Sequence, residues 1–138
     1  MKNQELSDRI EEIKQLDESC RSRGVTIMTN CVGTAFYAKG LVESDKLIFP
    51  DIPNDKVLIQ ERLSHLNRIK KPVHGSLVVF ITDNEVDHMG IILIEHQTLW
   101  RRLDIFYREG ADLRVRTMPF KTYLRLAKLF WDKIEYYI

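Results

Sequence analysis

The sequence predicts an α+β domain in which N-terminal helices pack on a four-stranded antiparallel sheet, with one more helix at the C-terminal end. Two observations predict this class. Apolar residues recur at helical spacing before Gly75 and again after residue 119, whereas runs rich in β-branched and aromatic residues fill the stretch between them. Helices followed by strands favour an α+β arrangement. A 138-residue chain with 44% hydrophobic residues suits a single domain over residues 1–138.

The first predicted helix follows from an apolar stripe near the N-terminal end. The stripe consists of Leu6, Ile10, Ile13 and Leu16, with charged residues between them. This spacing is typical of an amphipathic helix of about four turns. Cys20 continues the stripe, so we expect it to be a small core residue.

Two more helices are predicted before the sheet. A Thr-Asn pair precedes Cys31, and both residue types are good N-caps, while Gly40 is placed where a left-handed residue would end a helix. Cys31 should therefore lie in the first turn of a short helix. A third helical pattern covers residues 57–69 and stops before Pro72.

Four strands and a closing helix complete the prediction. The strand-like runs are residues 76–82, 88–95, 98–108 and 112–118, and short turn-like segments separate them. In the final segment, residues 120–138, helical spacing returns at Tyr123, Ala127, Phe130, Ile134 and Tyr137.

Composition argues against several kinds of partner. The 21 Lys+Arg and 20 Asp+Glu residues nearly cancel, and no aromatic–basic platform is evident, so we expect no nucleic-acid partner. No apolar run reaches the length of a membrane span, and the first residues lack the apolar core of a secretory signal, so we expect no membrane span and a cytoplasmic location. The sequence does not predict an oligomeric state.

The cysteines and histidines do not form a metal-binding pattern. Two cysteines in a chain of this length do not make a disulfide framework. His65, His74 and His96 have no ligand spacing with them, and no glycine-rich phosphate loop is present, so we expect no metal and no cofactor.

Cys31 and His88 are the candidates for nucleophilic chemistry. Free N–H groups at a helix N-terminus favour a thiolate, and we expect this position to lower the pKa of Cys31. His88 opens an apolar strand just before Gly90, where it could reach such a helix end. The alternatives are a buried structural thiol and a surface histidine in a turn.

Three segments carry a family resemblance. The strings NCVGTAFYAKG, HGSLVVF and DHMGIILI resemble, in order and spacing, the central motifs of NlpC-type peptidases, papain-like enzymes related to CHAP-type amidases. The resemblance runs from about Thr29 to about Leu124. It implies a papain-like fold, with Cys31 as nucleophile, His88 as general base and the Cys31 N–H as one oxyanion donor. It also implies a small peptide or a peptidoglycan-like substrate.

The sequence departs from the family pattern at three points. Ser76 replaces an acidic residue at a turn, and no tyrosine occurs in residues 21–30, so the second oxyanion donor is unassigned. The third residue, which would orient the imidazole of His88, is also not obvious.

For this third role we predict Asp104, because a carboxylate stabilises an imidazole that gains positive charge. Arg101 and Arg102 align better by spacing, but a cation would oppose that charge. His96 is another option, and a pair without a third member is also compatible with cysteine catalysis.

The leading hypothesis is a cysteine hydrolase that cleaves an amide or peptide bond through a thioester. A second hypothesis keeps the same pair but passes the acyl group to an amine or a lipid. A third, from a different class, is a binding module on an inactive scaffold, since fold does not fix function.

Overall fold

The computed structural model describes residues 2–95, 102–110, 114–127 and 130–138. Within them it has four helices and six strands, and the α+β prediction is confirmed. The helices are α1 (Asn3–Ser22), α2 (Cys31–Lys39), α3 (Pro53–Ser64) and α4 (Phe120–Ala127). The strands are β1 (Arg68–Ile69), β2 (Leu77–Thr82), β3 (Glu85–Glu95), β4 (Arg102–Arg108), β5 (Val115–Pro119) and β6 (Lys133–Tyr137).

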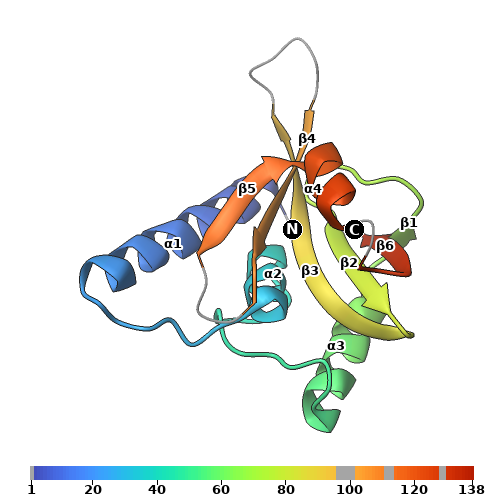
Figure 1. Cartoon of the computed structure of the whole chain (residues 1–138), viewed down its shortest axis with the longest axis horizontal. Coiled ribbons are helices and arrows are strands. Elements are labelled where there is room, and N and C mark those ends of the chain that lie inside the picture. Colours follow the sequence, from blue (N-terminus) through green and yellow to red (C-terminus); the bar gives the residue numbers. More distant parts are fainter. Residues whose placement is uncertain (1, 96–101, 111–113, 128–129) are drawn as a thin grey trace.

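The strands form one antiparallel sheet in the order β1-β6-β2-β3-β4-β5 (Figure 1). Side chains from α1, α2 and α3 pack with one face of β2 and β3, around Phe36, Val79 and Ile91. Side chains from α4 pack on the other face, against Phe80 and Ile105. The sheet therefore separates two apolar cores.

The sheet has six strands in its described part, not the four predicted. The predicted C-terminal helix over residues 120–138 ends at Ala127, and the chain returns as β6 along β2, from Leu77↔Tyr137 to Ile81↔Lys133. Because β2 is apolar on both faces, a helix there would leave its backbone edge without partners. The third helix also ends early, at Ser64, and residues 68–69 pair with β6 instead.

Helix α1 differs from its predicted stripe at one position. Leu6, Ile10, Ile13 and Cys20 are buried, as expected, but Leu16 is 45% exposed and the neighbouring Asp17 is buried instead. The Asp17 carboxylate accepts two hydrogen bonds from the fully buried Arg108 guanidinium on β4, at 2.8 and 3.1 Å. A buried charge at this position requires such a partner, which the local spacing could not indicate.

Helix α2 begins and ends where the sequence predicts. It approaches the connection after it so closely that a Cβ at Gly33 would lie 1.6 Å from the Lys46 carbonyl oxygen, which only glycine avoids. Gly40 ends the helix with a φ of 79°. The N-terminus of α2 is thereby held between β3 and the segment around Lys46.

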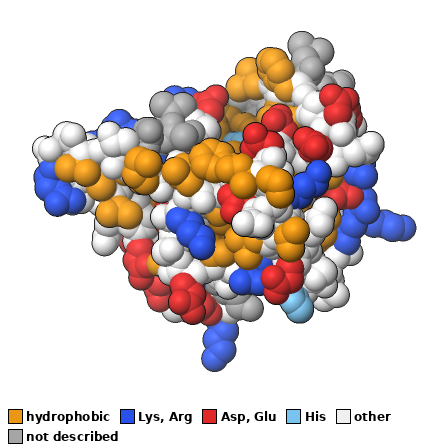
Figure 2. All heavy atoms as spheres, turned by 90° about the horizontal axis from the view of Figure 1, so that it is seen from below, with side chains coloured by type: hydrophobic (Ala, Val, Ile, Leu, Met, Phe, Trp, Pro, Cys, Tyr) orange, Lys and Arg blue, Asp and Glu red, His pale blue; other side chains and the backbone are white. Residues whose placement is uncertain are grey.

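The surface carries several exposed hydrophobic side chains. Figure 2 shows the molecule from below the view of Figure 1. Hydrophobic side chains run across the middle of this face, with acidic side chains beside them. None of the helices that the structure describes is both long and apolar enough to cross a membrane.

Candidate active site

Cys31 is the first residue of α2, as predicted. Asn30 caps the helix through its Oδ1, which accepts a hydrogen bond from the Gly33 N–H at 3.0 Å. Its Nδ2 donates to the Ile48 carbonyl at 2.8 Å, so the cap is tied to the neighbouring segment. The Asn30 cap therefore fixes the position of Cys31 in the first turn of α2.

His88 lies within β3, not at its start. The β2–β3 turn consists of Asp83 and Asn84 alone, both with positive φ, so β3 already begins at Glu85. The register shifts between Phe80↔His88 and Ile81↔Val86, which places a β-bulge beside His88. Bulges re-aim side chains, and here the imidazole enters the aromatic core under α4.

Aromatic rings surround the His88 imidazole. Trp131 stacks on it at 5.8 Å between centroids and 6° between planes, while Tyr107 lies edge-on at 5.6 Å. The Trp131 Nε1 donates to Asp87 at 2.7 Å, which holds the indole in place. His88 is only 7% exposed, and its Nε2 is buried without a hydrogen-bond partner among the residues described.

Cys31 and His88 line one open pocket of about 370 Å³. The pocket lies at the end of the sheet where the β3–β4 ladder stops, because its pairing begins only at Ile91↔Phe106. Its other lining residues are Asp87, Tyr107, Glu109, Gly110, Arg116, Met118, Tyr123, Leu126, Ala127, Phe130 and Trp131. No hydrogen bond joins the Cys31 sulfur to the His88 ring in the described part of the chain, so the two groups share a pocket without being hydrogen-bonded to each other.

The thiol of Cys31 is not a preformed thiolate. Burial raises its pKa, and this outweighs the backbone N–H groups of Met89, Val32 and Cys31 itself, which lower the pKa. The negative charge of Asp87 raises it further. The N–H groups act as the sequence analysis expected, but the expected lowered pKa is wrong, because desolvation is the larger effect.

His88 is neutral near pH 7. Burial lowers its pKa to about 4, although the nearby Asp87 charge acts in the opposite direction. A neutral imidazole beside a neutral thiol can still accept the thiol proton when a carbonyl is bound, since apo geometry need not show the catalytic hydrogen bond.

The structure does not bring Asp104 to this pocket. Asp104 pairs with Leu93 in the β3–β4 ladder, well beyond the end where His88 lies. Its carboxylate accepts hydrogen bonds from the Arg102 guanidinium at 2.9 and 3.3 Å, and it lines a different pocket beside α1 and His74. We therefore leave Asp104 and Arg102 out of the candidate site.

The other sequence candidates are also elsewhere. His96 and Arg101 lie outside the described residues. The Ser76 hydroxyl donates to the Val73 carbonyl at 2.7 Å and so closes a turn away from the pocket.

Sequence reasoning missed two pocket residues, Tyr107 and Tyr123. Both belong to apolar patterns, one in a strand and one in a helical stripe, and these patterns indicate only structural positions. Their place in the pocket depends on α4 crossing the sheet, which no local signal indicates.

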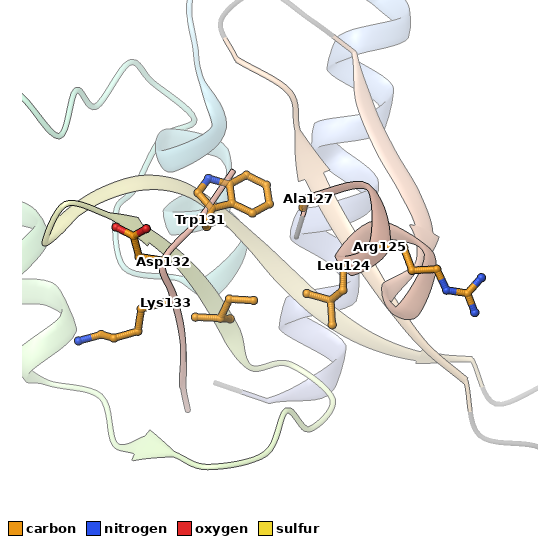
Figure 3. Close-up of a pocket in the computed structure, with 7 residues that line it drawn as sticks. Leu124, Arg125, Ala127, Trp131, Asp132 and Lys133 are labelled. Carbon is orange, nitrogen blue, oxygen red and sulfur yellow. The ribbon is translucent and has the colours of Figure 1, made fainter. Parts of the chain in front are cut away.

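A second pocket, of about 450 Å³, adjoins the first and shares Ala127 and Trp131 with it. Figure 3 shows its walls, with Leu124 and Arg125 on α4, Trp131 and Asp132 just before β6, and Lys133 at the start of β6. Trp131 thus forms part of the wall of both pockets.

Comparison with protein-family models, with curated proteins and with solved structures finds no match for this chain.

Proposed function

We propose that the protein is a papain-like cysteine hydrolase that cleaves an amide or peptide bond. The observation that carries the proposal is the shared pocket: a thiol at a helix N-terminus and an imidazole from the sheet open on the same cavity. The three motifs that resemble NlpC-type peptidases support the same pair. By that resemblance, the substrate is a small peptide or a peptidoglycan-like peptide.

In this mechanism the Cys31 sulfur attacks the carbonyl carbon while its proton passes to His88. The Cys31 N–H donates to the developing oxyanion. Collapse of the adduct breaks the C–N bond, the amine leaves with the proton from His88, and water then hydrolyses the thioester. No third residue is required of the described chain, since the pair acts as a dyad.

An acyltransferase is the second candidate, and the rim of the pocket favours it. Leu126 and Phe130 line the pocket and are 64% and 68% exposed, so an apolar acceptor or acyl chain would find contacts there. Both reactions share the first half, and only the acceptor of the acyl group differs.

The first test is acylation by p-nitrophenyl acetate, followed by mass spectrometry of the intact protein and of its peptides. We expect an acetyl group on Cys31 that neutral hydroxylamine removes, as it does from a thioester. Cys20→Ala should acylate like the wild type, because Cys20 is buried in the α1 core. Cys31→Ala should not.

Absence of both an adduct on Cys31 and a Cys31-dependent release of p-nitrophenolate would instead favour the inactive binding module. Repeating the reaction with an added amine separates the two enzymes, since a transferase gives the amide and a hydrolase gives only free acid.

A further inference from the structure

A thioester mechanism needs more than one donor for the oxyanion. The Cys31 N–H supplies one, and residues 21–30 contain no tyrosine that could supply another. A positioned hydroxyl is a common second donor because it stabilises charge that develops only in the transition state. A hydroxyl that lines the pocket and has no partner of its own would meet this need.

Tyr123 has such a hydroxyl. It projects from α4, is 8% exposed, and lines the pocket together with Cys31 and His88. Its ring centroid lies 6.0 Å from that of His88 and 4.7 Å from that of Tyr107. Among the described residues its hydroxyl makes no hydrogen bond, and it is not one of the polar atoms buried without a partner, so it is open to the pocket and available to a bound group.

The phenol of Tyr123 also remains a donor at any working pH. Burial raises its pKa, and the neighbouring Tyr107, Glu109, Cys31 and Asp87 raise it further when they are negatively charged. A protonated hydroxyl in the same pocket as the sulfur can donate to an oxyanion without competing for the thiol proton.

We propose that Tyr123 is a catalytic residue whose hydroxyl donates the second hydrogen bond to the oxyanion. This inference rests on the proposed function of Cys31. When the C–S bond forms, the carbonyl π electrons move to oxygen and the thiol proton moves to His88. Tyr123 keeps its own proton and shares it with that oxygen, and the hydrogen bond is released when the carbonyl re-forms.

Tyr107 offers a matched control in the same pocket. The Arg116 guanidinium approaches its hydroxyl and lowers its pKa, although burial is the larger influence and raises it. Arg116 thus lowers the pKa of Tyr107, whereas no cation lowers that of Tyr123. Both Tyr→Phe changes keep the ring and its packing.

The experiment compares two reactions of the same sulfur. Acylation by p-nitrophenyl acetate passes through an oxyanion, whereas alkylation by iodoacetamide displaces iodide at carbon and does not. For Tyr123→Phe we expect acylation of Cys31 to slow roughly 10²-fold, the usual effect of one lost oxyanion donor. The alkylation rate of Tyr123→Phe should stay within about twofold of the wild type, because alkylation forms no oxyanion. Tyr107→Phe should change neither rate by more than that, because it removes no oxyanion donor.

Two results would overturn the role of Tyr123: acylation that is unchanged in Tyr123→Phe, or acylation and alkylation that slow together, as a structural role would predict. Failure of the proposed function has a different signature. In that case Cys31→Ala would acylate as fast as the wild type, and the inference about Tyr123 would fall with it.

Discussion

Because the imidazole of His88 is buried, the unfolding free energy of the protein should fall as the pH falls. Its pKa is lowered to about 4 in the folded chain, from an ordinary value near 6.5, because burial opposes the cation. A lowered histidine pKa means that the unfolded chain binds the proton more tightly. The contribution to stability is therefore complete above about pH 6.5 and is lost as the pH falls towards 4.

Replacing His88 with phenylalanine should remove this acid sensitivity. The new ring would keep the aromatic contacts with Phe80 and Trp131 and cannot be protonated. Between about pH 7 and pH 4, the wild type should lose about 3 kcal/mol more unfolding free energy than His88→Phe. Urea denaturation at both pH values measures the difference. Equal losses in the two proteins would show that the folded chain accepts a proton on His88 freely.

At the scale of elements, the buried Arg108 joins parts of the chain that are distant in sequence. Its guanidinium binds Asp17 on α1, donates to the Thr34 hydroxyl of α2 at 2.8 Å, and lies 3.5 Å from Asp45. The Asp17 carboxylate also accepts from the Val115 N–H of β5 at 3.0 Å. This network holds α2, and with it Cys31, against β4.

Breaking the network should be costly. Arg108→Met leaves the Asp17 carboxylate buried without a cation, and we expect a loss of about 3–5 kcal/mol of unfolding free energy in urea. Adding Asp17→Asn should recover part of this loss, because the unpaired charge disappears. Lys56→Met breaks the exposed pair with Glu85 and serves as the control, with a loss below about 1 kcal/mol. A similar small loss for Arg108→Met would contradict the role of the network.

Local signals explain which elements could be predicted. Asn30 and Gly40 bound α2 through capping rules that act within one turn, so the position of Cys31 follows from sequence. The helix predicted through Ile134 and Tyr137 was wrong because strand pairing with β2 overrides the local spacing. The bulge beside His88 depends likewise on the partner strand.

At the scale of the whole molecule, the candidate site is made by three segments that meet only in the folded chain. α2 supplies Cys31 from one face of the sheet, β3 supplies His88, and α4 supplies Tyr123 from the other face. Their three side chains line one pocket, where β3 and β4 separate. Cys31 and His88 could be named as candidates from motifs, but Tyr123 could not. Asp104 was expected beside His88, whereas the β3–β4 register pairs it with Leu93.

If His88 takes the proton of the Cys31 thiol, the rate of acylation must depend on pH in a specific way. Because the thiol pKa is raised and that of His88 is lowered to about 4, the reactive form at neutral pH is a neutral pair. An isolated thiol reacts only through its thiolate, so its rate rises about tenfold per pH unit until its pKa is reached.

The most direct measurement is the rate of Cys31 acylation by p-nitrophenyl acetate against pH in the wild type and in His88→Gln. We predict a wild-type rate that rises through about pH 4 and then stays level to neutral pH, where His88 is the base. In His88→Gln the rate should climb with pH throughout this range. The same pH profile in both proteins would show that His88 is not the base.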